Sequence, residues 1–216
     1  MYLEPWLELV SPTKTRGRAR ELRWDRAESV HFGCDGIDPP LFKLYVEYPL
    51  GRSRRSDIPP DAGFLSAKWQ PGGALGYSIY RVLPEPATAP AARTALLGAI
   101  AEDVGAASLR FADAVLAGIL MPDAPVSTLV VEDETSRRRS FDINLYRAET
   151  PLARHRSAIR DLCAAFGLPD AARAILADGE GTMLGHVAIG RDDRGAEFVT
   201  LYYGVTTREG ARDPRR

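Results

Sequence analysis

The sequence lacks several features that would place a protein in a class at once. It has no long uninterrupted apolar run, no basic or apolar leader at its start, and only two cysteines, Cys34 and Cys163, outside any CxxC spacing. We therefore expect no membrane span, no disulfide framework and no structural zinc, and we expect a cytoplasmic protein with reduced cysteines.

An excess of one charge is also missing. The 28 basic and 29 acidic residues nearly cancel, so no whole-protein field favours nucleic acid or an anionic membrane. The usual catalytic motifs GxGxxG, GxSxG and HExxH are absent, and Asp192-Asp193 is not continued as DDxxD. Only three basic residues are lysines, and two of them, Lys43 and Lys68, fall in predicted strands. The function has to be sought in a local site.

What the sequence does contain is alternating apolar runs in pairs, separated by longer helical patterns. The predicted strand pairs are 29–34 with 41–48, 64–70 with 77–83, 128–132 with 140–147, and 184–190 with 198–205. Helices are predicted over 91–120, from Thr150-Pro151 to Gly167, and from Pro169 to about 177. The pattern predicts an α+β fold: an antiparallel β-barrel or strongly curved sheet of repeated strand pairs with helices outside. Its parts would be an N-terminal arm (1–28), one domain (29–205) and a disordered tail (206–216).

Each predicted strand separates into an apolar and a polar list, because alternate side chains point to opposite faces. The apolar lists, for example Phe141, Ile143 and Leu145, are expected to pack on helices. Leu97 and Leu152 are expected on the buried sides of their own helices, whereas His155 is expected to face solvent. The polar face is either a solvated face of an open sheet or the lumen of a barrel. Its repeated tyrosines and scarce arginines favour an enclosed pocket. The polar list comprises Lys43, Tyr45, Glu47, Lys68, Asp142, Asn144, Tyr146, His186, Thr200 and Tyr202.

Four segments carry a resemblance to a known family: Gly36-Ile37-Asp38 leading into LFKLYVEYP (41–49), SFDINLY (140–146), Leu184-Gly185-His186, and FVTLYYG (198–204). Over roughly residues 30–205 the chain resembles the ABBA, or PT-barrel, prenyltransferases, most of all the cyanobactin-type peptide prenyltransferases. The resemblance implies a closed barrel with outer helices that binds dimethylallyl diphosphate through lumen Lys, Arg and Tyr residues. It also implies that Lys43 touches the diphosphate and that Tyr146 and Tyr202 shield the allyl cation.

The chain departs from this family at its N-terminus. The family has one more strand pair there, which supplies a glutamate base and an arginine for the diphosphate, whereas only residues 1–26 precede the first predicted pair here. Four pairs would close a smaller barrel, or a partner chain would supply the missing pair, or the barrel would be open and inactive. Glu47 is the candidate that replaces the missing base.

The function expected from these residues is transfer of a dimethylallyl or longer prenyl group from an allylic diphosphate to a peptide or small aromatic acceptor. Mg²⁺ would help when present, and no protein metal ligands or organic cofactor are expected. The alternatives are a non-catalytic binding barrel and a subunit that completes a barrel with another chain; an unpaired edge at 29–34 would favour a homo-oligomer or a partner chain. The expected catalytic residues are Glu47 and Asp142; the diphosphate ligands are Lys43, Lys68, Arg81 and Tyr202; the prenyl and acceptor pocket comprises Tyr45, Tyr80, Asn144, Tyr146, His186 and Thr200.

Overall fold

A computed structural model describes residues 27–35, 39–48, 62–83, 88–99, 104–121, 123–133, 139–192 and 194–204. The predicted arm lies almost wholly outside these ranges, and the predicted tail lies wholly outside them. The strands are β1 (Ser29–Asp35), β2 (Leu41–Glu47), β3 (Ala62–Trp69), β4 (Gly76–Val82), β5 (Ser127–Asp133), β6 (Arg139–Asn144), β7 (Leu184–Arg191) and β8 (Glu197–Tyr203). The helices are α3 (Ala89–Ala99), α4 (Ala106–Ala117), α5 (Arg156–Ala165) and α6 (Pro169–Asp178), with short 3₁₀ helices η3 (Tyr146–Ala148) and η4 (Leu152–His155).

The eight strands follow one another in the sheet in the order in which they occur along the chain, from β1 to β8. The four strand pairs from β1–β2 to β4–β5 are all antiparallel. These observations confirm the predicted α+β class with an antiparallel sheet. Within the described ranges, no helix is long and apolar enough to cross a membrane.

The chain divides into two compact units, which are described separately. Unit 1 comprises residues 1–84, 128–142 and 190–196, and unit 2 comprises residues 85–127, 143–189 and 197–216.

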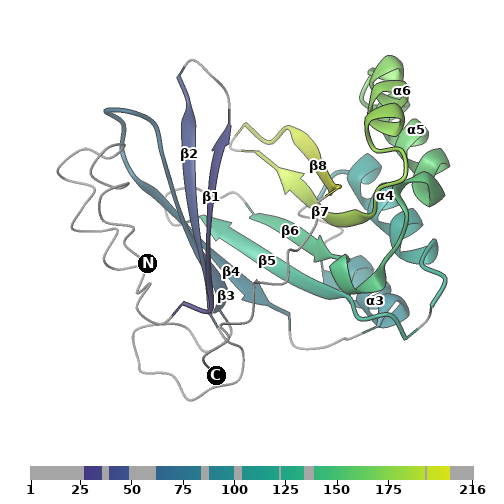
Figure 1. Cartoon of the computed structure of the whole chain (residues 1–216), viewed down its shortest axis with the longest axis horizontal. Helices are drawn as coiled ribbons and strands as arrows, with labels where there is room; N and C mark the ends of the chain where they lie inside the picture. Colours follow the sequence, from purple (N-terminus) through teal and green to yellow (C-terminus); the bar gives the residue numbers. More distant parts are fainter. Residues whose placement is uncertain are drawn as a thin grey trace, which may run out of the picture. The chain divides into compact units, whose positions relative to one another are not determined.

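Unit 1 is built on antiparallel strands, of which β1 and β2 form a long hairpin (Figure 1). Alternate residues of β2 and β3 are buried on one face of the sheet, which we call the apolar face: Leu44, Val46, Ala67 and Trp69. Directly opposed residues in an antiparallel pair share a face, and the β2–β3 register places Leu44 opposite Ala67 and Val46 opposite Leu65. The predicted alternation therefore holds in these strands.

Unit 2 contains the four helices, which contact one another in chain order: α3 with α4, α4 with α5, and α5 with α6. Helix α5 buries Ile159, Leu162 and Cys163. It ends as predicted at Gly167, whose φ of 69° lies in the left-handed region that favours glycine. The N–H of Leu168 then donates to the Cys163 carbonyl at 2.7 Å, which satisfies one of the last carbonyls of the helix.

Three local predictions were wrong. The strand expected to run to residue 147 ends at Asn144, because the Asn144 side-chain oxygen accepts a hydrogen bond from the Tyr146 N–H at 3.1 Å and turns the chain into η3. Leu97, expected on the buried side of its helix, is 39% exposed. His155, expected to face solvent, is 2% exposed, because η4 places it on the same side as the buried Leu152.

Candidate functional site

The candidate site lies on the face of unit 1 opposite the apolar face, which we call the polar face. The strand registers arrange it in three rows that run across the strands. The lysine row consists of Gly33, Lys43, Lys68 and Gly76. The serine row consists of His31, Tyr45, Ser66, Ser78 and Asp133. The aromatic row consists of Ser29, Glu47, Phe64, Tyr80 and Val131.

The lysine row brings the two strand lysines together. Lys43 lies directly opposite Lys68, and both neighbours in the row are glycines, which leave the flanks of the two stems without side chains. Lys68 Nζ lies 3.9 Å from Asp133 Oδ1 in the next row. Two like charges directly opposite each other in a sheet oppose folding, so a bound anion between them would stabilise this arrangement.

The two serines of the serine row are screened from water, whereas His31 at the end of the row is exposed. Ser66 and Ser78 are 0% and 2% exposed, and the Ser78 hydroxyl donates to the Asp133 carboxylate. The charge of Asp133 is therefore shared between a hydroxyl donor and Lys68. A ligand that reached the lysine row would also meet a hydroxyl-rich, mostly dry surface.

The aromatic row forms an apolar end to the polar face. Tyr80 packs edge-on against Tyr45, with ring centroids 5.9 Å apart, and against Phe64 at 6.1 Å. Leu129 and Val131 complete this cluster. Burial raises the pKa of Tyr80 well above 10, and the neighbouring Tyr45 and the charge of Asp142 raise it further. The Tyr80 phenol is therefore neutral throughout the physiological range.

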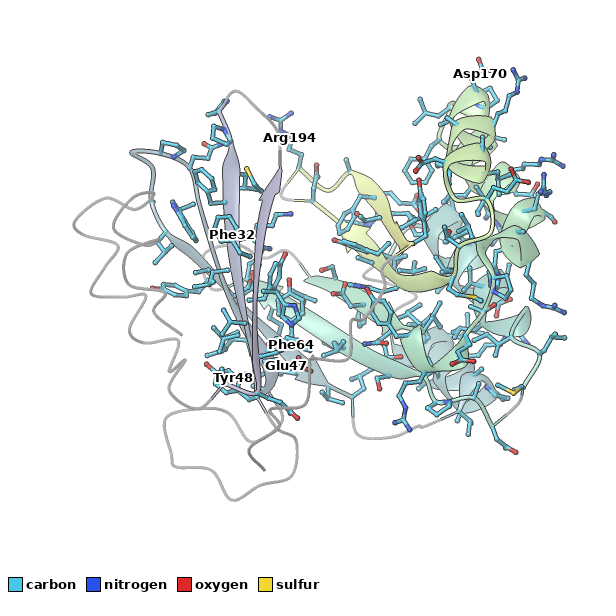
Figure 2. All side chains as sticks on the ribbon, in the orientation of Figure 1. Phe32, Glu47, Tyr48, Phe64, Asp170 and Arg194 are labelled. Atoms are coloured by element: carbon cyan, nitrogen blue, oxygen red, sulfur yellow. The ribbon has the colours of Figure 1, made fainter. Side chains whose placement is uncertain are left out.

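Glu47 lies at the same end, opposite Phe64 (Figure 2). Its carboxylate accepts a hydrogen bond from the Ser29 hydroxyl and lies 3.5 Å from His31 Nε2. The hydrogen bond with His31 lowers the pKa of Glu47 most, Ser29 lowers it further, and partial burial opposes both. The same Nε2 atom is 2.8 Å from Ser29 Oγ, so Ser29 and Glu47 share one ring nitrogen. A serine-histidine-acid relay uses both ring nitrogens, and this cluster therefore does not have its geometry.

The second predicted carboxylate, Asp142, is 8% exposed and lies near enough to Tyr80 to affect its pKa. Arg81 is placed differently from the lysines that it was predicted to join. It lies opposite Ala62 and Val130 on the apolar face, where its Nε donates to Glu132 Oε2 at 3.1 Å. The structure therefore separates Arg81 from the lysine row.

The remaining predicted residues belong to unit 2, where three of them form an aromatic stack. The His186 imidazole lies parallel to the Tyr202 ring with centroids 4.3 Å apart, and Tyr146 meets it edge-on at 6.5 Å. Tyr146 packs directly on Gly185, where a Cβ would lie 2.3 Å from the ring. Asn144 holds the backbone of Tyr146, whereas Thr200 is exposed on β8.

Sequence reasoning missed Ser29, His31 and Asp133, which contact predicted residues, and Ser78, which donates to Asp133. The sequence could have identified Ser29 and His31, because both alternate with apolar residues in β1. The row that each residue joins, however, depends on the strand register. Within the described ranges, no group of three or more His, Cys, Asp and Glu side chains has the arrangement of a metal site. Comparison of the chain with known protein families, with curated proteins and with solved structures found no match.

Proposed function

We propose that the protein binds an allylic diphosphate on the polar face of unit 1 and transfers its prenyl group to a peptide or small aromatic acceptor. The observation that carries the proposal is the order of the three rows: cationic, then hydroxyl-rich, then aromatic. Successive rows lie roughly 7 Å apart, because alternate residues of a strand are separated by two rises. The groups of an allylic diphosphate follow a matching order, from an anionic head to a short apolar tail.

In this proposal, Lys43 and Lys68 receive the diphosphate. Ionisation breaks the bond between the allylic carbon and the diphosphate oxygen, and the bonding electron pair leaves with that oxygen. The two ammonium groups stabilise the charge that develops there, and the buried neighbours Ser66 and Ser78 lower the local polarity and so strengthen this interaction. The rings of Tyr45 and Tyr80 offer π-faces to the allyl cation. Mg²⁺, when present, would arrive bound to the diphosphate.

The acceptor then forms a bond to the allylic carbon and releases a proton. We assign this proton to Asp142, because Asp142 is buried and close enough to Tyr80 for its charge to affect the tyrosine, whereas the hydrogen bonds from His31 and Ser29 make Glu47 a weaker base. A tyrosine or tryptophan side chain of a peptide, or a free phenol or indole, would provide a suitable nucleophile.

Calorimetric titration with a non-hydrolysable dimethylallyl diphosphate analogue tests the binding step. We expect Lys43→Gln to weaken binding about 10- to 100-fold, since a hydrogen bond to a charged group contributes about 1.5–3 kcal/mol. Arg81→Gln is the matched control, because Arg81 lies on the apolar face. Equal losses in both variants would contradict the assignment of the site, and titrations with and without Mg²⁺ show what the ion contributes.

Intact-mass analysis of acceptor peptides after incubation with dimethylallyl diphosphate tests the chemistry. Asp142→Asn is expected to lower transfer about 10²- to 10⁴-fold while the analogue still binds. Binding of the analogue without any mass increase in a panel of Tyr- and Trp-containing peptides would instead indicate the non-catalytic binding protein.

A further inference from the structure

Strand β1 has the properties of an unprotected sheet edge. It is the first strand in the sheet order, so within the described part of the chain it pairs only with β2. Natural edge strands are commonly protected by Lys, Pro or a β-bulge. The β1 sequence SVHFGCD contains neither Lys nor Pro, and its register with β2 is continuous over all of its residues.

The central residue of β1 is a large, exposed apolar side chain. Phe32 is 56% exposed and lies on the β1–β2 hairpin (Figure 2). Its ring centroid is 6.0 Å from that of Phe42, which in turn is 5.8 Å from the buried Trp69. These three side chains form an aromatic chain across the apolar face, from the core to the outer edge of the sheet. This aromatic chain of side chains ends at Phe32, where apolar surface is exposed to water.

We propose that β1 pairs antiparallel with β1 of a second copy of this protein, about a two-fold axis at Phe32. This proposal does not depend on the proposed function. Such pairing would place Phe32 opposite its own copy, Val30 opposite Cys34, and Ser29 opposite Asp35 of the partner. All residues of β1 would then be paired, and the aromatic chain would continue from one protomer into the other.

Charge and length favour a second copy in this register. In β1 the only acidic residue is Asp35 and the only basic residue is His31, and the register places them opposite Ser29 and Gly33, so no like charges meet. A register centred on His31 would place two imidazoles opposite each other. One centred on Gly33 would pair only residues 31–35. A two-fold contact of this kind is self-complementary, as the commonest homodimers are.

Disulfide cross-linking tests the register. Directly opposed residues of antiparallel strands have Cα atoms about 4.5–5.5 Å apart, which lies within the range of a disulfide. Val30→Cys should therefore link to the native Cys34 of the partner and give a covalent dimer under mild oxidation. The double variant Val30→Cys/Cys34→Ser should not, because the two introduced cysteines would lie four residues out of register. Cross-linking in both variants, or in neither, would overturn the proposal.

Light scattering tests the association independently of cysteine chemistry. The wild-type protein should have about twice the chain mass of 23.6 kDa. Phe32→Lys should weaken the dimer about tenfold or more, because it places two ammonium groups at the two-fold axis. Leu120→Lys is the control, since Leu120 is 71% exposed and lies in unit 2. A wild-type monomer at tens of micromolar, or a dimer that Phe32→Lys leaves unchanged, would overturn the proposal, and circular dichroism verifies that each variant is folded.

Discussion

The two units hold their ionisable side chains in different ways. On the polar face of unit 1, charged and hydroxyl groups meet other side chains across strands, as Lys68 and Ser78 meet Asp133. Unit 2 also has pairs of side chains, such as Arg93 with Asp113, but two of its charged groups are held by the backbone and by a helix end. The Ser108 N–H at the start of α4 donates to Glu197 Oε1 at 2.5 Å, and Arg154 Nε donates to the Gly118 carbonyl at 2.7 Å.

This difference separates groups available to a ligand from groups that stabilise the fold. A lysine held by another side chain can exchange that partner for a phosphate oxygen without disturbing the backbone. A carboxylate that receives a helix N–H cannot leave without exposing an unsatisfied backbone donor. This contrast supports the proposed site in unit 1, and we expect substitution of Glu197 or Arg154 in unit 2 to affect stability.

The largest effect is expected in the core of unit 1. Trp69 is 2% exposed, and Trp69→Ala should lower the free energy of unfolding by about 3–5 kcal/mol, through lost apolar contact and a cavity. Denaturant unfolding followed by circular dichroism measures the change. The exposed Leu120, replaced by alanine, should change stability by less than about 0.5 kcal/mol. A loss in Trp69→Ala as small as in this control would show that the apolar face is not a packed core.

A pH effect of about 3 kcal/mol is expected in unit 2. Burial, together with the smaller effect of the neighbouring Arg154 charge, lowers the pKa of His155 from 6.5 to about 4. Below pH 6.5 the unfolded chain therefore binds a proton that the folded chain does not bind until about pH 4. The free energy of unfolding should therefore decrease as the pH is lowered from 6.5 to 4, by an amount set by the separation of the two pKa values.

Unfolding of His155→Gln at several pH values measures this contribution. Glutamine keeps a polar group near Thr150 Oγ1, which lies 2.8 Å from His155 Nε2, and removes the titration. The slope of stability against pH between 4 and 6.5 should decrease in the variant. An unchanged slope would show that His155 is protonated in the folded chain like an ordinary histidine.

A smaller effect is expected at the start of α4. Glu197→Ala should lower the free energy of unfolding by about 1–2 kcal/mol, because it removes an anionic acceptor from a helix N-terminus. Glu180→Ala, at an exposed position, provides the control. Gly105→Ala should have a similar effect, since a Cβ there would lie 1.9 Å from the Glu197 carboxyl carbon and displace it. Equal stability of all three variants would contradict this role of Glu197.

The smallest effect is expected for the exposed cluster in unit 1. The pKa of Glu47 is lowered in the folded chain, chiefly by the hydrogen bond with His31, so its stabilising contribution is present above its ordinary value of 4.5 and is lost as the pH falls below it. Glu47→Gln should remove up to about 1 kcal/mol at neutral pH, because a third of the side chain is exposed to solvent. A loss as large as that of Trp69→Ala would show that this cluster is a buried network.

Alternation in the sequence was sufficient to locate every strand to within a few residues, because period-two apolar runs are bounded by turn residues. The predicted separation of Phe141 and Ile143, both fully buried, from the partly buried Asn144 follows from the same alternation. The sequence did not predict where a local hydrogen bond ends a strand, as at Asn144, or which residues a 3₁₀ helix buries, as in η4.

The candidate site was predictable only strand by strand. Alternation identified Lys43 and Lys68 as residues of one face, but the fact that they oppose each other depends on the β2–β3 register. The same rule excludes Arg81 from that face, since it follows Tyr80 directly and consecutive strand residues point to opposite sides. The prediction that Tyr80 and Arg81 belong to one site therefore conflicted with the alternation from which the other site residues were predicted.

The order of the strands in the sheet has a consequence for how the chain folds. Strands that neighbour each other in the sheet are also consecutive among the strands of the sequence, so β1–β2 and β3–β4 are hairpins that can form as soon as their residues leave the ribosome. Pairing of β4 with β5 has to wait for α3 and α4, which lie between them in the chain. Closing that longer loop costs more chain entropy than closing a hairpin. Folding should therefore proceed from fast local hairpins to a slower step in which β5 joins β4.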